Sequence, residues 1–108
     1  MTRTYFSEEP ASGAGPVDVF VRCPAAGRRE LDPRLDLARH SPSGFSWGYR
    51  GSGPAQLALA VTADALGDER ALAAYQDFKD DVVAPRDEAA AFLSTSAAVE
   101  AWAAAEGY

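Results

Sequence analysis

The sequence predicts an α+β domain in which a small antiparallel sheet from the amino-terminal half is covered by two or three carboxy-terminal helices. Period-two alternation of apolar and polar residues, typical of strands, is concentrated in the first half of the chain. From Pro54 onward the apolar residues recur at helical spacing instead. Strands followed by helices are typical of α+β domains. A chain of 108 residues has room for one core, so we expect a single domain over residues 1–108.

Three strands are expected early in the chain. The first covers residues 4–6, and the glycines and prolines of residues 10–16 predict a turn after it. Residues 17–22 alternate valine with other side chains, which predicts the second strand. Phe20 lies on the face of this strand opposite the valines, which indicates that this second face is covered too. Residues 28–31 are expected to return as the antiparallel partner of the second strand.

The next segment leads from the sheet to the helices. Asp32 and Pro33 fit the N-cap and the first position of a short helical turn that reaches toward His40. Residues 41–44 then form a turn. Residues 45–49, Phe-Ser-Trp-Gly-Tyr, alternate aromatic with small side chains and predict a strand with three aromatics on one face. The open edge of such a strand could pair two copies of the chain into a homodimer.

Two long helices are expected next. The first, from Pro54 to Leu66, is apolar on most sides, which predicts burial all round, and Gly67 ends it. The second runs from Glu69 to about Ala84, before Pro85. Its apolar stripe consists of Leu72, Tyr75, Phe78 and Val82.

The carboxy-terminal segment holds a last helix. Phe92 and Leu93 form either a short strand or an apolar staple. Residues 94–96, Ser-Thr-Ser, are good helix caps, and the helix that they begin runs to about Glu106.

The net charge of the chain limits the kinds of partner that it can bind. A net charge of −6 argues against direct binding to nucleic acid, because contacts with phosphates need clustered Lys and Arg. An acidic face attracts a basic protein surface instead. We therefore expect a small acidic interaction protein, without enzymatic activity, that binds a protein partner. The candidate contact residues on the second helix are Asp77, Asp80 and Asp81. Trp47 and Tyr49, which precede the first helix, are also candidates.

A second hypothesis concerns the glycine-rich loop before the first helix. Backbone N–H groups and the positive end of the helix dipole can bind a phosphate or nucleotide there. The candidate ligand-binding residues are Arg50, Gly51, Ser52, Gly53, Gln56 and His40. The loop lacks the Gly-Lys-Ser/Thr ending of a Walker loop. The structural alternative is that Gly51 and Gly53 adopt positive φ in a tight turn beside Trp47 and Tyr49.

No cofactor, metal site or catalytic set is expected. Cys23 is the only cysteine and His40 the only histidine, whereas a structural zinc site takes four such ligands. A nucleophile elbow at Ser52 would need glycine where Arg50 and Pro54 stand. The amino terminus lacks the apolar core of a signal peptide, and no segment is long enough to span a membrane. These features predict a soluble cytoplasmic protein.

Several stretches of the sequence resemble one family. They are L-D-P-R-L-D-L at 31–37, H-S-P-S-G-F at 40–45, W-G-Y at 47–49 and G-S-G-P-A-Q-L-A-L-A at 51–60. Together with Y-Q-D-F-K at 75–79 and Trp102, they are similar to a family of small prokaryotic and phage-type proteins that is defined as a domain of unknown function. The resemblance implies a small standalone α+β domain, often encoded near mobile elements, and therefore an accessory or anti-defence role. Arg50 stands where that family usually has glycine.

Overall fold

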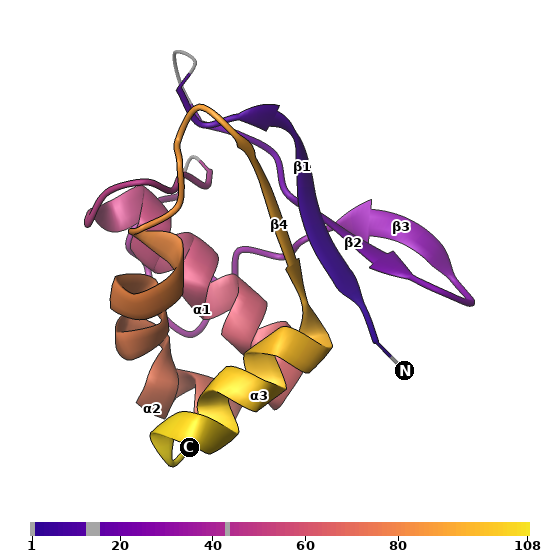
Figure 1. The fold of residues 1–108 in the computed structure, drawn as a ribbon, viewed down its shortest axis with the longest axis vertical. Helices are drawn as coiled ribbons and strands as arrows, with labels where there is room; N and C mark the ends of the chain where they lie inside the picture. The colour runs from indigo at the N-terminus through magenta and orange to yellow at the C-terminus, as the bar shows by residue number, and fades with distance from the viewer. Residues whose placement is uncertain (1, 13–15, 43) are drawn as a thin grey trace.

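The computed structural model describes residues 2–12, 16–42 and 44–108. Over these residues the elements are, in chain order, β1 (Thr4–Pro10), β2 (Phe20–Cys23), β3 (Gly27–Glu30), α1 (Ser52–Leu66), α2 (Asp68–Phe78), the π-helix η1 (Lys79–Val83), β4 (Ala91–Thr95) and α3 (Ser96–Glu106). The predicted α+β class is confirmed (Figure 1). The turn residues Gly13 and Gly15, and Ser43 in the later predicted turn, lie outside the described residues.

The four strands form one antiparallel sheet in the order β3-β2-β1-β4. β4 comes from the second half of the chain and pairs with β1, so Phe92 and Leu93 belong to a strand and not to a staple. The valine alternation of the second strand holds, since Val19 and Val21 are buried, although regular pairing begins only at Phe20. The helices lie on one side of this sheet (Figure 1).

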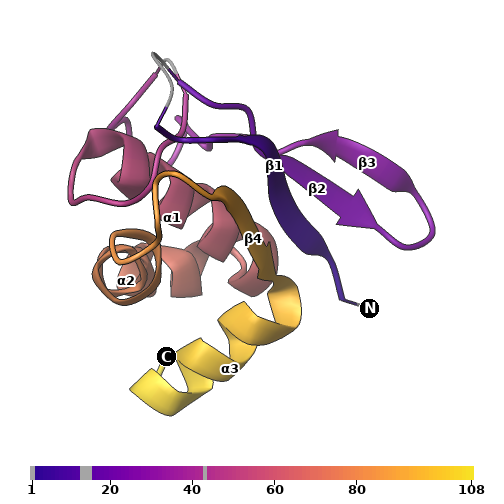
Figure 2. The same cartoon turned by 45° about the horizontal axis from the view of Figure 1, so that its top comes forward.

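The central helix α1 lies between the sheet and α2 (Figure 2). Its residues from Gly53 to Ala63 are all buried, as the sequence predicted. Contact on both sides explains why this helix is apolar all round. The buried hydroxyl of Thr62 donates a hydrogen bond of 2.7 Å to the carbonyl oxygen of Ala58, so it adds no unsatisfied polar group.

Helix α2 turns a different face inward from the one predicted. Leu72 of the predicted stripe is 47% exposed, whereas Ala71, Ala74 and Phe78 are buried. Small alanine side chains let α2 approach the alanine-rich surface of α1 closely, and this close packing replaces the expected contact through Leu72. The prediction for Phe78 is confirmed.

The second helix does not continue as an α-helix to Ala84. It changes at Lys79 into the π-helix η1, where the N–H of Ala84 bonds to the carbonyl oxygen of Lys79 at 2.8 Å. A π-turn adds one residue per turn and rotates the side chains that follow. Asp80 and Asp81, which were expected on a regular second helix with Asp77, therefore lie in this π-turn.

The strand predicted at residues 45–49 is absent. Only Phe45 forms a bridge, to Val17, and Gly48 takes φ = +92°, which breaks the alternation after Trp47. Phe45 and Trp47 are buried, while Tyr49 is 48% exposed, so the three aromatics do not share a face. No open strand edge exists there for pairing two copies.

The helical turn predicted after Asp32 is present but begins later, since the carbonyl oxygen of Arg34 accepts hydrogen bonds from the N–H groups of Leu37 at 3.0 Å and Ala38 at 3.4 Å. The Asp32 carboxylate accepts a hydrogen bond of 2.9 Å from the N–H of Arg34, which itself takes φ = +56°. A residue in this left-handed region cannot continue a right-handed helical turn. Ion pairs from Arg34 to Asp36 at 3.0 Å and to Asp68 at 2.8 Å hold the guanidinium in place.

Candidate functional site

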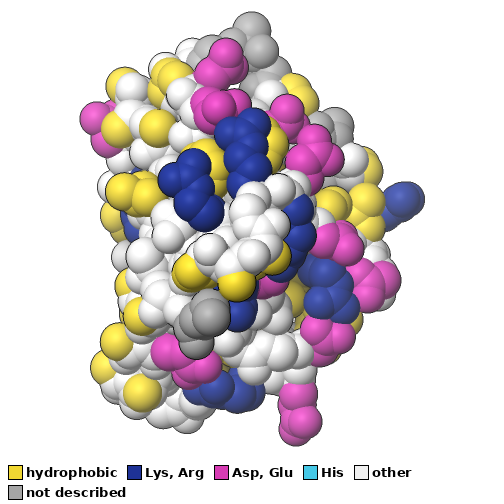
Figure 3. All heavy atoms as spheres, turned by 90° about the vertical axis from the view of Figure 1, so that its right-hand side faces the viewer, with side chains coloured by type: hydrophobic (Ala, Val, Ile, Leu, Met, Phe, Trp, Pro, Cys, Tyr) yellow, Lys and Arg dark blue, Asp and Glu magenta, His cyan; other side chains and the backbone are white. Residues whose placement is uncertain are grey.

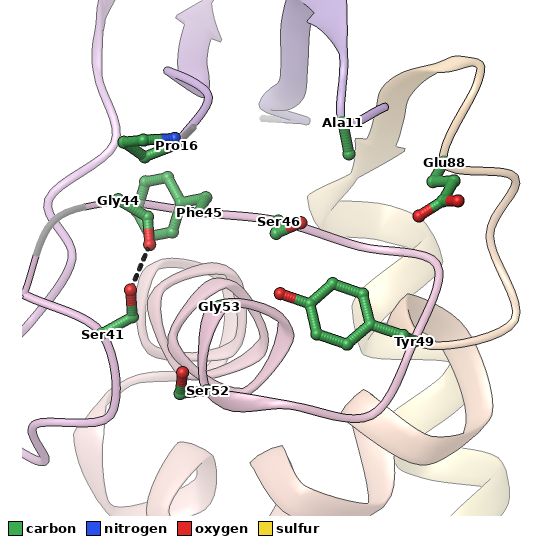
Figure 4. A pocket seen from close by; sticks show the side chains of 10 residues that line it. All are labelled: Ala11, Pro16, Ser41, Gly44, Phe45, Ser46, Tyr49, Ser52, Gly53 and Glu88. Carbon is green, nitrogen blue, oxygen red and sulfur yellow. Dashed lines mark hydrogen bonds between the residues drawn. The ribbon is translucent and has the colours of Figure 1, made fainter. Parts of the chain in front are cut away.

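A hollow of about 340 Å³ opens at the amino end of α1, where the glycine-rich loop joins the helix (Figure 4). Four hydroxyl side chains line it: Ser41, Ser46, Tyr49 and Ser52. Of the described residues that line the hollow, only Glu88 is charged. The hollow therefore offers hydrogen-bonding groups and one negative charge, but no cation.

The glycines of the loop make room for neighbouring side chains. A Cβ atom on Gly51 would lie 2.5 Å from the ring of Tyr49, and one on Gly53 would lie 2.9 Å from Cβ of Ser46. Gly51 is extended at φ = −158° and Gly53 is already helical, so the predicted positive φ at both positions is wrong. Their lack of a side chain instead lets the Tyr49 ring lie flat on the loop, with its hydroxyl directed into the hollow (Figure 4).

Arg50 points away from the hollow. Its guanidinium is largely exposed, and Nε lies 3.4 Å from the carboxylate of Asp80 at the start of η1. Of the predicted ligand-binding residues, the structure brings Ser52 and Gly53 to the hollow and leaves Arg50 outside it.

Gln56 is fully buried and all its polar atoms are satisfied within the chain. Its Nε2 donates to the carbonyl oxygens of Pro33 and Ala38, at 2.5 and 3.1 Å, and its Oε1 accepts from the N–H groups of His40 and Ser41, at 2.7 and 3.0 Å. Gln56 thus ties the long loop before α1 to the helix. It has no polar atom left for a ligand.

His40 contributes its ring to a contact with α2. Its Nε2 lies 2.8 Å from the hydroxyl of Tyr75, and the two rings are 5.6 Å apart between centroids. The ring does not line the hollow.

Two of the three candidate aspartates hold the carboxy terminus. Asp77 accepts a hydrogen bond from the hydroxyl of Tyr108, and this contact raises the pKa of that phenol. Asp81 accepts one of 3.1 Å from Nε1 of Trp102 on α3. These carboxylates therefore have structural partners within the chain.

Asp80, in η1, forms an ion pair with the glycine-rich loop. Its carboxylate lies 3.4 Å from Nε of Arg50 and 3.6 Å from Nζ of Lys79; the Arg50 and Asp80 side chains are exposed, whereas that of Lys79 is mostly covered. Arg50 directly follows Tyr49 in the chain, so this ion pair places Asp80 near the loop that carries the half-exposed tyrosine ring.

Trp47 lies in the core and takes no part in that surface. It is fully buried, its ring packs 5.5 Å from that of Phe92, and its Nε1 donates a 3.0 Å hydrogen bond to the carbonyl oxygen of Ala90. Trp47 is therefore not part of the candidate contact surface.

A polar cluster that the sequence reasoning missed joins the sheet to the carboxyl end of α1. The Asp64 carboxylate accepts hydrogen bonds from Tyr5 at 2.6 Å, from Arg3 at 2.7 Å and from Arg29 at 2.8 Å. Burial alone would raise the pKa of Asp64, but the hydrogen bonds from Tyr5 and the two arginines outweigh it and lower the pKa. Burial and the Asp64 carboxylate raise the pKa of Tyr5. The cluster is a structural clamp with every group paired.

We expect Asp64→Asn to lower the free energy of unfolding by about 2–3 kcal/mol, because it removes the charge that three buried or half-buried donors share. The carboxylate has a lowered pKa in the folded state, so it stabilises the fold above its unfolded pKa of about 3.9. That stabilisation disappears as the pH falls through the lower, folded-state pKa. Urea unfolding between neutral and acidic pH measures both effects, and Asp64→Asn should flatten this part of the profile. If the free energy of unfolding of Asp64→Asn fell with pH as steeply as that of the wild type, the role of Asp64 would be contradicted.

The fold and its hollow define a small α+β protein whose central helix is enclosed between a four-stranded antiparallel sheet and a helical layer. Residues 16–105 match the model of a family of unknown function, DUF6166. The match covers most of the chain, which therefore belongs to that family. Comparison with curated proteins and with solved structures returned no match.

Within the described ranges, none of the helices combines the length and the apolar character needed to cross a membrane.

Proposed function

We propose that the chain is a non-enzymatic interaction protein that binds a basic protein surface through Tyr49 and Asp80. The contact surface consists of the Tyr49 ring, Asp80 with its partner Arg50, and the neighbouring carboxylates of Asp77 and Asp81. The observation that carries this proposal is the half-exposed Tyr49 ring, which lies against Gly51 beside a hollow. We further propose, from the resemblance of the sequence to small prokaryotic and phage-type proteins, that the chain acts in the cytoplasm as an accessory or anti-defence factor of a mobile element.

A fixed, half-exposed tyrosine is a suitable anchor for a protein contact. Tyrosine is enriched among the residues that dominate binding energy, because it offers a large surface at low cost in side-chain entropy. The Tyr49 ring is held by the loop, since a side chain at Gly51 would collide with it. The adjacent hollow provides space for a side chain of the partner.

The charges around Tyr49 favour a basic partner. Glu88 lines the hollow, and Asp80 lies next to Arg50, which directly follows Tyr49. The chain as a whole carries a net charge of −6. Complementary charge steers encounter and excludes acidic surfaces.

The test is quantitative affinity purification from the cells in which the protein naturally occurs, with tagged wild type, Tyr49→Ala and Asp80→Lys. We expect one or more proteins to be enriched with the wild type and lost by about tenfold or more with both variants. Leu72→Ala is the matched control, because Leu72 is equally exposed on α2 and lies outside the proposed surface. Equal recovery with Tyr49→Ala and Leu72→Ala would contradict the proposal.

Phosphate or nucleotide binding at the amino end of α1 is the alternative function. The hydroxyls of Tyr49 and Ser52 and the positive end of the α1 dipole favour it. Glu88 on the wall of the hollow opposes it, as does the position of Arg50 next to Asp80. This balance makes the alternative the weaker of the two.

A thermal-shift series with phosphate and nucleotides separates the two functions. A ligand at 100 times its Kd adds about 2.7 kcal/mol, which is on the order of 10 °C for a domain of this size. We expect no such shift with the wild type. An anion site would produce the shift, Glu88→Gln would increase it, and Arg50→Ala would leave it unchanged because Arg50 does not line the hollow.

A further inference from the structure

The face of the sheet that turns away from the helices carries an apolar row. Phe6 of β1 pairs with Phe20 of β2 on one side and with Leu93 of β4 on the other. The two phenylalanine rings are 5.7 Å apart between centroids, and Leu93 is 61% exposed. None of the described helices lies over this outer face (Figures 1 and 2). An exposed apolar row of this kind is typical of an interaction surface.

Arginines lie on the outer face beside this row. The guanidinium carbon of Arg22 is 4.8 Å from the centre of the Phe6 ring, and that of Arg28 is 4.3 Å from the centre of the Phe20 ring. Figure 3 shows basic side chains lying against hydrophobic surface on the side of the molecule that carries β2 and β3. Arg28 also pairs with Glu8 at 3.1 Å, whereas Arg22 has no carboxylate within 4 Å among the described residues.

The opposite end of the outer face is acidic. Asp18 precedes Phe20 by two residues and Arg22 follows it by two, so all three side chains point to the outer face. A second hollow, of about 230 Å³, lies at this end and is lined by Glu8, Glu9, Asp18 and Phe20. Its described lining includes no basic side chain, although Glu8 of that lining already pairs with Arg28. Such a hollow is suited to a guanidinium group.

These positions make the outer face complementary to itself. A two-fold axis along the apolar row would place a second sheet face to face with the first and exchange the two ends of each strand. The apolar row of one copy would then pack against the apolar row of the other. Arg22 of each copy would lie against Asp18 of the other copy. In a two-fold interface, every such contact occurs twice.

We infer that two copies of this chain associate through the outer faces of their sheets, with each Arg22 entering the acidic hollow beside Asp18 of the other copy. Packing two sheets face to face buries the apolar side chains of both inner faces. This interface includes none of Tyr49, Arg50 and Asp80, so the dimer would leave these side chains free in both copies, although Pro16 lines both hollows.

A second copy fits the face better than a nucleic acid. Asp18, Glu8 and Glu30 share the face with the two arginines, and these carboxylates would repel phosphates. A second copy instead matches the three apolar side chains of the row and pairs Arg22 with Asp18 at both ends, while Glu30, at the β3 end of the row, would meet its counterpart in the other copy.

The first test is the mass in solution by light scattering up to about 100 µM protein. We expect twice the chain mass of 11.4 kDa for the wild type, and the mass of one chain for Leu93→Glu. Leu72→Glu is the control, with a similarly exposed leucine on α2, and should remain dimeric. A monomeric wild type, or a Leu93→Glu variant that is as dimeric as the wild type, would overturn the inference.

Charge exchange tests the orientation of the two copies. Asp18→Arg and Arg22→Glu should each be monomeric, because like charges then meet twice in each homodimer. An equimolar mixture of the two should form a heterodimer, in which every contact is again between opposite charges. Recovery of the dimer on mixing also shows that both variants are folded. Single variants that dimerise normally, or a mixture that stays monomeric, would overturn the two-fold arrangement.

Discussion

Gln56→Met is expected to lower the free energy of unfolding by about 3–5 kcal/mol, although methionine has nearly the same shape as glutamine. The amide of Gln56 makes four hydrogen bonds to the backbone of the loop that runs from Pro33 to Ser41. Methionine would leave two buried N–H groups and two carbonyl oxygens without these partners. Urea unfolding measures the loss, and hydrogen exchange should show faster exchange at His40 and Ser41.

The matched control for this variant is Leu59→Met. Leu59 is fully buried in the same helix, and a leucine-to-methionine change of similar volume usually costs less than about 1.5 kcal/mol. A loss for Gln56→Met that is no larger than the loss for Leu59→Met would contradict the structural role of the amide.

Trp47→Ala is expected to cost about 3–5 kcal/mol, because it removes the largest fully buried side chain and leaves a cavity. The ring packs against Phe92 and donates a hydrogen bond to Ala90, so it joins the segment before α1 to the segment that enters β4. Trp47→Phe keeps part of the packing and loses only the hydrogen bond and some volume. We expect its cost to be less than half that of Trp47→Ala.

Urea unfolding measures both Trp47 variants. The lost fluorescence of the variants identifies the signal of Trp47, which should move to longer wavelength when the wild type unfolds. A Trp47→Ala variant as stable as the wild type would contradict the burial of this ring.

Patterns with a strong period or strong composition predicted the fold well. The apolar run from Pro54 to Leu66 predicted a buried helix because a helix without a polar face has to be covered all round. Phe92 and Leu93 form a strand, as one of the two predicted alternatives had it. Thr95 caps α3, since its hydroxyl accepts from the N–H of Ala98 at 3.1 Å.

The errors arose where tertiary contacts override a local pattern. Aromatic and small residues alternate at 45–49 as they would in a strand, but Gly48 takes a positive φ and lies so close to Glu88, which is distant in sequence, that a side chain would not fit. Leu72 fits an apolar stripe, yet α2 packs through alanines because its neighbour α1 is itself rich in alanine. Neither contact can be read from local sequence.

The polar residues of the buried helix indicate structural hydrogen bonds. Gln56, Thr62 and Asp64 are the polar residues of α1 between Ala55 and Leu66; Gln56 and Asp64 make hydrogen bonds to other segments, and Thr62 makes one within the helix. A polar residue in a buried helix needs a partner, so these three positions mark structural contacts. The position of Gln56 directly after a glycine-rich loop predicts ligand binding, but its amide bonds only to the chain itself.

Photocrosslinking at position 49 tests the proposed contact surface most directly. A benzoylphenylalanine placed at Tyr49 retains an aromatic ring on the loop, and the same group at Leu72 provides an equally exposed control. In the cells in which the protein naturally occurs, we expect a covalent adduct with a basic protein from position 49 and none from position 72. The adduct should disappear when Asp80→Lys is added. Adducts of equal yield from both positions, or none from position 49, would contradict the assignment of the Tyr49 surface to a protein partner.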